Sequence, residues 1–317
     1  MQKRGLTASG KQRWYCPKCS VSAVQTRPDI TAQFRRDLFV RWLTGSRSLD
    51  EIAAELAVTR RTLIRWFKPL WTCPKEPVVH EQLHGSVYVL DGVYLSGRDN
   101  VALICKAMPA THFWSFAERE TAASWKRFLQ ELPAPEVVVI DGQKGLSKVI
   151  GQLWPRVKIQ RCLVHIERLA RIRLTRHPKS QAGKELLALV RRLFDVRNGK
   201  QKRRWLAVYR RWERRHADFL RERSEGDPVP GKRRRWWYTH RNIRAARSLI
   251  RNSLPHLFTF IGRPDVPRST NHVEGGINSR IKELIHRHRG LNDEQKRVLV
   301  ALFLGQNQRQ KPPRNVT

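Results

Sequence analysis

The chain has 317 residues, 40% of them apolar, and 63 Lys and Arg against 27 Asp and Glu, which gives a formal net charge of +36. This length allows two to three domains with buried cores, and the composition excludes an intrinsically disordered chain. The charge predicts a polyanionic partner, by default nucleic acid. No apolar run approaches the ~20 residues that cross a bilayer, and the first ten residues, MQKRGLTASG, contain no apolar signal segment. We therefore expect a cytoplasmic protein with no membrane partner.

Residues 1–28 contain the pair Cys16 and Cys19 in a CxxC arrangement. A structural zinc ion needs four ligands, so one such pair is half a site. The next cysteine, Cys73, stands alone, and the five scattered cysteines do not indicate a disulfide framework. Two interpretations stay open for this segment: a partial zinc ribbon, or a small basic loop without metal.

Residues 31–70 are predicted to be helical. Ser48 and Glu51 form a capping box at the start of one short helix, and Thr59 caps a second one, RRTLIRWF. The second helix exposes Arg60, Arg61 and Arg65, as the recognition helix of a helix-turn-helix would. The alternative is a helical hairpin that packs on the core. The following segment, TCPKEPVV, is predicted to be a linker.

From residue 86 the apolar pattern changes to that of strands. Three strands, SVYVLDGVYL, VALICKAM and HFWSFAE, suggest an antiparallel meander, and the helix TAASWKRFLQEL follows. The run VVVI is typical of a buried central strand and leads directly into Asp141. A helix to Trp154, a strand VKIQRC and a helix from Leu163 complete the order β-β-β-α-β-α-β-α. This order, with acids at the first and fourth strands, predicts an α/β fold with a mixed sheet of the ribonuclease-H-like type.

Residues 181–260 show no strand pattern and are predicted to be an all-helical insertion. Between Arg197 and Arg251 the chain has 19 Lys and Arg but five Asp and Glu. Solvated helix faces would explain the charge, and some of the interleaved tryptophans must belong to a core. A basic surface with exposed aromatic rings also suits unstacked bases at a DNA end, and Trp236 and Trp237 are the candidates for that role.

Three acids, Asp91, Asp141 and Glu274, are candidates for one catalytic site. Phosphodiester cleavage places negative charge on the attacking and the leaving oxygen, and two Mg²⁺ ions held by carboxylates can stabilise both. Without metal, neighbouring carboxylates would raise one another's pKa. The alternative for Asp141 is an N-cap of the helix that follows it.

Together these motifs carry a resemblance. Asp91 in VLDGVYL, Asp141 in VVVIDGQKG, the following IQRCLVH and the terminal STNHVEGGINSRIK resemble the Mutator-like DDE superfamily of bacterial insertion-sequence transposases. The resemblance covers nearly the whole chain. It implies a catalytic domain interrupted by a helical insertion, with Asp91, Asp141 and Glu274 holding two Mg²⁺ ions, which Mn²⁺ could replace. Cys162 and His165 match the family's CxxH signature.

The resemblance further implies that Cys162, His165, Asn271 and Arg280 support the active site. For Cys162 and His165, metal ligation is one interpretation, and a packed thiol with a hydrogen-bonded imidazole is the other. The implied activity is cleavage at terminal inverted repeats and joining to target DNA by a homodimer on the bacterial nucleoid, with no small-molecule substrate. Two rival interpretations are a DNA-binding regulator with an inactive nuclease fold and a structure-specific nuclease.

The expected domain organisation follows from these motifs. The predicted segments are a partial zinc-ribbon-like segment at 1–28, a helix-turn-helix domain at 29–72, a linker at 73–84, the first catalytic part at 85–180, the basic helical insertion at 181–265, the last catalytic part at 266–306 and a tail at 307–317. In this organisation the insertion separates Glu274 from the other two acids in the sequence, so the fold must bring them back together.

Overall fold

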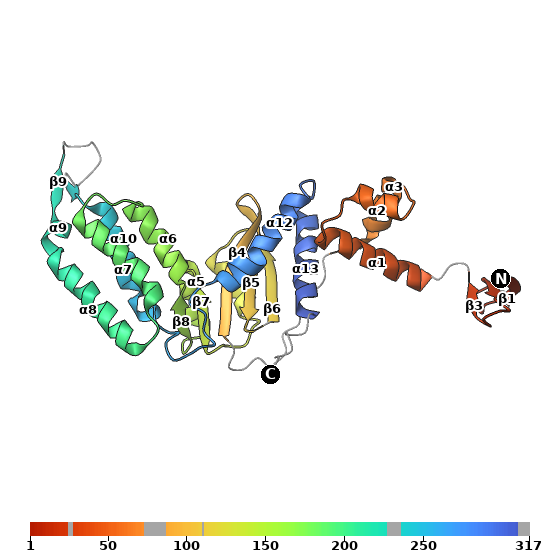
Figure 1. Cartoon of the computed structure of the whole chain (residues 1–317), viewed down its shortest axis with the longest axis horizontal. Helices are drawn as coiled ribbons and strands as arrows, with labels where there is room; N and C mark the ends of the chain where they lie inside the picture. The colour runs from red at the N-terminus through yellow and green to blue at the C-terminus, as the bar shows by residue number, and fades with distance from the viewer. Residues whose placement is uncertain (25–27, 73–86, 110, 227–235, 310–317) are drawn as a thin grey trace. The chain divides into compact units, whose positions relative to one another are not determined.

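The chain forms two compact units. The computed structural model describes residues 1–24, 28–72, 87–109, 111–226 and 236–309 (Figure 1). The N-terminal unit comprises Met1–Pro74 and His286–Phe303, and the sheet unit comprises Lys75–Ile285 and Leu304–Thr317. The predicted linker at 73–84 and the last eight residues of the predicted tail lie outside the described residues. Within these described ranges, no helix combines the length and the apolar character that crossing a membrane requires.

The N-terminal unit begins with a small antiparallel sheet and continues with three helices. Its elements are β1 (Gln2–Leu6), β2 (Gln12–Tyr15), β3 (Ser22–Val24), α1 (Pro28–Thr44), α2 (Leu49–Glu55), α3 (Arg60–Phe67) and a 3₁₀ turn (Lys68–Leu70). The predicted capping box of α2 is confirmed, since Ser48 Oγ accepts from the Glu51 N–H and the Glu51 side chain accepts from the Ser48 N–H. Thr59 caps α3 in the same way. Phe39, Leu63 and Phe67 form part of its buried core.

A segment from the far end of the chain belongs to the same unit. The rings of Trp42 and His288 lie 5.0 Å apart, His288 Nε2 lies 3.0 Å from the Leu43 carbonyl oxygen, and Arg287 donates to the Gly45 carbonyl. The helix α13 (Asp293–Arg309) follows, so helical structure continues past residue 306, where the tail was predicted to start. The end of the chain is therefore divided between the two units.

The sheet unit contains a mixed five-stranded sheet. Its strands are β4 (Val87–Ser96), β5 (Asp99–Ala107), β6 (Thr111–Ala117), β7 (Val137–Ile140) and β8 (Lys158–Arg161), in the order β6-β5-β4-β7-β8. The first three in sequence form an antiparallel meander, and β7 and β8 are parallel to β4. The predicted mixed α/β fold is confirmed.

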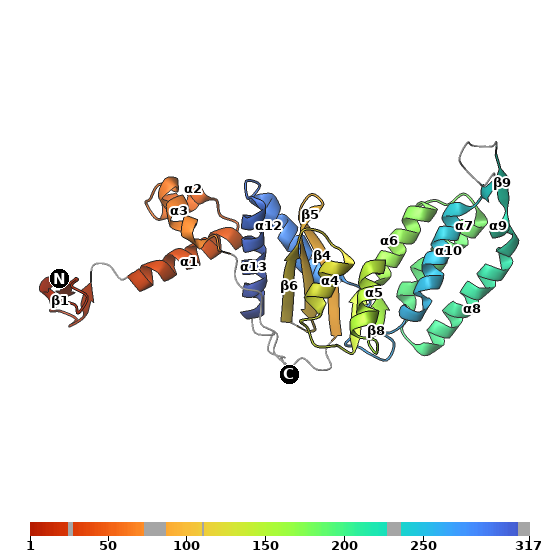
Figure 2. The same ribbon diagram turned by 180° about the vertical axis from the view of Figure 1, so that it is seen from behind.

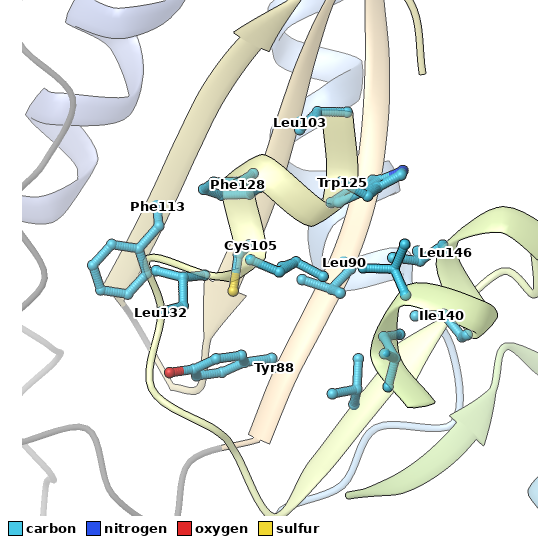
Figure 3. Close-up of a cluster of buried hydrophobic side chains, with 14 of the residues drawn as sticks. Tyr88, Leu90, Leu103, Cys105, Phe113, Trp125, Phe128, Leu132, Ile140 and Leu146 are labelled. Carbon is cyan, nitrogen blue, oxygen red and sulfur yellow. The ribbon is translucent and has the colours of Figure 1, made fainter. Parts of the chain in front are cut away.

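The two faces of the sheet are covered differently. Along β4 and β7, alternate residues such as Tyr88, Leu90 and Ile140 pack into one core with α4 (Ala122–Leu129) and α5 (Lys144–Leu153) (Figure 3). Figures 1 and 2 show α12 (Ser279–Arg287) and α4 on opposite faces. Because side chains alternate along a strand, the residues between these core positions face the side that α12 covers.

A block of helices follows the last strand. Its helices are α6 (Leu163–Leu174), α7 (Gln181–Arg191), α8 (Gly199–Arg215), α9 (Ala217–Arg221) and α10 (Arg241–Ser253), with 3₁₀ turns at Arg192–Asp195 and Leu254–His256. Trp205, Tyr209 and Trp212 stack in a buried row along α8. The indole N–H groups of the two tryptophans donate to backbone carbonyls of α7. These aromatic residues of the basic block are therefore core, as the sequence required of some of them.

One prediction for this block was wrong. It is not entirely helical, because β9 (Arg223–Glu225) and β10 (Trp236–Tyr238) pair as a small antiparallel hairpin, which places Trp237 opposite Ser224. The strands have three residues each, too short for an alternating apolar pattern to identify them in a sequence this rich in arginine. This hairpin stands beyond the row of core aromatics and carries both tryptophans that were predicted to meet DNA.

Candidate active site

The register of two parallel strands places Asp91 beside Asp141. Val87, Tyr88 and Val89 of β4 pair with Val137, Val138 and Val139 of β7. Two residues further along both strands, Asp91 is level with Asp141, and neighbouring strands lie about 4.8 Å apart. Both acids occupy the alternate positions that face away from the core of α4 and α5. The strand pattern therefore brings two carboxylates together at the carboxyl end of β7, where ligands bind in many α/β sheets.

Asp91 is held through both of its carboxylate oxygens. The Gly92 N–H donates to Oδ1 at 3.0 Å, and Asn278 Nδ2 donates to Oδ2 at 2.7 Å. Burial raises the pKa of Asp91 to about 7, and repulsion from Asp141 and Glu274 adds to this rise. Asp141 and Glu274 are thus close enough to Asp91 to affect its pKa.

Asp141 lies in a tightly closed turn. Its Oδ1 accepts from the Gln143 N–H at 2.9 Å, while Gln143 itself is the N-cap of α5. The N-cap interpretation of Asp141 was therefore wrong. Gly142 has φ +92°, and a Cβ there would lie 1.6 Å from the guanidinium carbon of Arg161, which donates to the Asp141 carbonyl at 3.0 Å. This turn requires a glycine for both its conformation and its space.

Glu274 is brought to the sheet by the start of α6. The Leu163 N–H donates to the Arg268 carbonyl at 2.9 Å, and Cys162 Sγ accepts from the Thr270 N–H at 3.4 Å and its hydroxyl at 3.5 Å. These contacts join segments more than 100 residues apart in the sequence. Glu274 follows in a π-helical turn (Glu274–Asn278) between α11 (Asn271–Val273) and α12.

Two cationic side chains of α6 face Glu274. His165 Nε2 lies 3.9 Å from Oε2, and Arg168 Nη1 lies 3.9 Å from Oε1. The hydrogen bond from His165 Nδ1 to Cys162 Sγ, at 3.2 Å, raises the pKa of His165 to about 9. Burial alone would raise the pKa of the Cys162 thiol, but the hydrogen bonds from His165 and Thr270 lower it below its usual value. Cys162 and His165 thus form a hydrogen-bonded pair beside the acids.

Sequence reasoning missed two side chains at this edge. Asn278 is 2% exposed and contacts Asp91 directly. Glu120, just before α4, places its carboxylate so close to Gly92 that a Cβ there would lie 2.9 Å from its Cδ. Burial raises the pKa of Glu120, and the charge of Asp141 acts in the same direction. Asn278 was within the terminal motif, whereas nothing in the sequence around Glu120 marks it.

The other predicted site residues lie elsewhere. Arg280 donates to Glu283 on its own helix at 2.5 Å, and Asn271 is exposed. Arg60, Arg61 and Arg65 are exposed on α3, as predicted, while Trp237 of the hairpin is 43% exposed. Trp236 stacks on Arg223, whose guanidinium lies 4.0 Å from its ring centre.

Cys16 and Cys19 lie in the loop between β2 and β3, and both have free thiols. Hydrogen bonds from the backbone and thiol of Cys19 lower the pKa of Cys16. Over the described ranges of the chain, no His, Asp, Glu or further Cys joins them to make a group of three. Two sulfur ligands do not by themselves complete a zinc site.

The carboxylates at the sheet edge suit a hard divalent cation in their chemistry. Oxygen ligands are the ones Mg²⁺ prefers, and Glu274 Oε2 is buried without a hydrogen-bond partner among the described residues. Burial and, after it, the charges of Asp141 and Glu274 raise the pKa of Asp91, and a bound cation would offset both effects. In the described residues no three His, Cys, Asp or Glu side chains stand in position to share one ion. The acids are gathered, but not as a closed cage.

Comparison with known proteins identifies the family of this region. Residues 112–222 match the model of the Mutator family transposases. This segment of the chain is therefore similar to the Mutator family transposases. The matched range runs from β6 through Asp141, Cys162 and His165 into the helical block. The resemblance that the sequence motifs indicated is thereby confirmed.

A curated relative points the same way. The transposase for insertion sequence element IS905 from Lactococcus lactis subsp. lactis (strain IL1403) is 37% identical over 98 residues. The match covers 26% of this chain and about a quarter, 25%, of the relative's length. Both comparisons therefore concern transposases, and both rest on part of the chain.

Proposed function

We propose that this protein is a DNA transposase that cleaves the ends of an insertion sequence and joins them to target DNA. The observation that carries the proposal is the gathering of Asp91, Asp141 and Glu274 at one edge of the sheet, in a chain whose central segment is similar to the Mutator family transposases. The net charge of +36 supports a DNA substrate. A dimer would serve the two ends that such an element carries.

The strand order supports a ribonuclease-H-like assignment for the catalytic domain. A meander of three strands is followed by two strands parallel to the first of them, and the acids lie on the first and fourth strands in sequence. The helical block enters after the fifth strand and returns the chain to the sheet before Glu274. In this assignment the block is an insertion, and its hairpin is part of it.

The residues of the site have distinct roles in the proposed reaction. Asp91, Asp141 and Glu274 would hold divalent metal ions, which, when bound, supply charge stabilisation for the attacking and leaving oxygens. Cys162 positions the segment that carries Glu274, and His165 lies between that thiol and the acid. Arg168 neutralises part of the charge of Glu274 when no metal is present. Catalysis then rests on positioning and charge rather than on a protein nucleophile.

Two further regions would contact DNA. The exposed arginines of α3 suit the recognition helix of a helix-turn-helix, because α3 packs against α2 and buries Leu63 and Phe67 while Arg60, Arg61 and Arg65 stay outside. The β9–β10 hairpin presents Trp237 beside arginine-flanked aromatic rings, an arrangement that suits stacking on an unpaired base.

Incubation with Mg²⁺ and DNA that carries the element's two ends tests the proposal. We expect nicks at the ends and, with target DNA present, joined products. A DNA-binding regulator with an inactive nuclease fold would retard the DNA in a gel without nicking it. A structure-specific nuclease would nick but give no joined product. Either result would overturn the transposase assignment.

A further inference from the structure

The strongest unassigned contact of the site is made by Asn278. Its side-chain amide donates to Asp91 Oδ2 at 2.7 Å, and the two residues are 187 positions apart in the sequence. Asn278 is 2% exposed, so this bond is shielded from water. A single buried amide therefore connects strand β4 to the turn that carries Glu274.

The π-helical turn explains how Asn278 reaches the acids. The turn begins at Glu274 and ends at Asn278, and α11, which precedes it, packs against β4 and β5. Because a π-helical turn is wider than an α-helical one, the residue four positions after Glu274 returns to the same face of the helix. Such turns occur frequently at functional sites. One short segment thus supplies both an acid and the group that fixes a second acid.

The chemistry of the amide fits a site for a cation. The chain is rich in arginine and lysine, yet neither stands at this position. Either one would neutralise Asp91 and compete with a bound metal ion. A neutral amide orients the carboxylate and leaves its charge in place. Together with the Gly92 N–H on the other oxygen, it fixes both oxygens of Asp91.

The other end of the amide has no partner. Asn278 Oδ1 is buried and accepts no hydrogen bond from the described residues. An unpaired buried acceptor is costly in a folded protein, by about 1–3 kcal/mol, and is rare. This acceptor lies on a side chain that already contacts Asp91.

We propose that Asn278 is a positioning residue for the divalent cation site, which it serves by holding Asp91 in the orientation that binds metal and by linking it to Glu274. This inference rests on the proposed function for the identity of the ligand. Groups that orient a metal's ligands typically contribute about 10–100-fold to metal affinity. Asn278 should therefore affect metal binding more than it affects folding.

The test is Mn²⁺ binding by the full chain without DNA, measured by electron paramagnetic resonance. Asn278→Leu keeps the branched shape and removes the donor, Asn278→Ser keeps a shorter donor, and Asn252→Ala changes an exposed asparagine of α10 as a control. We expect the Kd for Mn²⁺ to rise about tenfold in the Leu variant, to rise less in the Ser variant, and to stay unchanged in the control. Thermal unfolding in EDTA checks that each variant is folded. If the Leu variant does not fold, the Kd of the Ser variant decides the test.

A second readout separates positioning from general damage. In a nicking assay, the Leu variant should need more Mg²⁺ for half-maximal rate and recover much of its rate when Mg²⁺ is saturating. Folded variants whose Kd for Mn²⁺ stays within about twofold of wild type would overturn the inference, even if wild type nicks DNA. Wild type that binds Mn²⁺ but never nicks would overturn the proposed function and leave the role of Asn278 standing.

Discussion

The acidic side chains at the sheet edge and those in the helical block have opposite electrostatic surroundings. In the helical block, Glu185, Glu213 and Glu222 each pair with an arginine or histidine side chain at 3.3 Å or less. At the sheet edge, Asp141, Glu274 and Glu120 raise the pKa of Asp91 against a smaller opposite effect of His165, and Glu274 has its cationic neighbours His165 and Arg168 at 3.9 Å. This happens in a chain with 63 basic residues against 27 acidic ones.

The difference separates structural residues from functional ones. Pairing each acid with a base stabilises a fold, whereas grouping acids destabilises it unless a ligand is present. The aromatic residues divide in a similar way, since the row along α8 is buried and bonded while Trp237 stays exposed. Matched substitutions in the two regions can test each half of this comparison.

The largest expected effect is on the aromatic row. Trp212→Ala should destabilise the protein by about 3–5 kcal/mol, because it removes a buried ring and leaves the Ala182 carbonyl without its donor. Trp237→Ala should change stability by less than about 0.5 kcal/mol but slow end processing, because a stacked base contributes about 1–3 kcal/mol. Urea unfolding measures the first effect and the nicking assay the second. Equal losses of stability would contradict the division.

The next effect concerns the turn after Asp141. Gly142→Ala should cost about 3 kcal/mol, because the residue has φ +92° and its Cβ would overlap Arg161. Gly151→Ala is the matched control, since it lies within α5 with open space around it. That substitution should stabilise the protein by about 0.5–1 kcal/mol. Urea unfolding of both variants checks the contrast, and a mild effect of Gly142→Ala would mean that the turn is not as closed as described.

Removal of one acid should stabilise the protein at the sheet edge and destabilise it in the helical block. The pKa of Asp91 is raised from near 3.8 to about 7, so the folded state retains a proton that the unfolded state releases as pH rises through this window. Stability contributed by this group is therefore present below pH 4 and lost by about pH 7. Asp91→Asn escapes that loss and should stabilise the metal-free protein by about 1–2 kcal/mol at pH 8.

The gain should shrink as the pH falls to 5 and vanish near pH 4. Glu213→Gln should instead destabilise at pH 8 by about 1–2 kcal/mol, because Arg247 Nε donates to this carboxylate at 2.6 Å. Thermal unfolding in EDTA at the three pH values measures both variants. A loss of stability for Asp91→Asn at pH 8 would show that the charged Asp91 does not destabilise the metal-free protein, and would contradict the comparison.

The smallest effect is expected at Glu120. Glu120→Gln keeps the shape and the acceptor for Trp125 Nε1, which lies 3.2 Å from Oε1, but removes one charge from the site. We expect end cleavage to fall about tenfold, equivalent to 1.4 kcal/mol. Glu118→Gln, two residues earlier and exposed, should cleave at the wild-type rate. Rates that fall equally in both variants would indicate a general effect of charge on DNA binding.

Local patterns were sufficient to predict the five strands of the mixed sheet and two of the acids. Val137–Ile140 is an uninterrupted β-branched run that leads into Asp141, and the strand with Asp91 begins with four buried residues. The capping boxes and helix starts of the N-terminal unit were equally local. The prediction of Glu274 depended on the resemblance, because no periodicity of the sequence links this residue to the sheet.

The remaining features depend on tertiary contacts that no local pattern encodes. Asn278 and Glu120 reach Asp91 and Gly92 from segments distant in sequence. The π-helical turn contains two consecutive glycines, Gly275 and Gly276. The sequence around them has no local pattern that distinguishes this turn from an ordinary helix. The division of the C-terminal segment between two units depends on Arg287 and His288 finding partners near Leu43. These features could be identified only in the folded structure.

The most direct test of the account compares Asp141→Asn with wild type on DNA that carries the element's ends. The substitution keeps the size of the side chain and removes one charge from the group of acids. We predict that end binding in a gel shift stays at the wild-type affinity while Mg²⁺-dependent nicking falls by about 10³-fold or more. Nicking by Asp141→Asn at a rate close to wild type would contradict the assignment of this sheet edge as the active site.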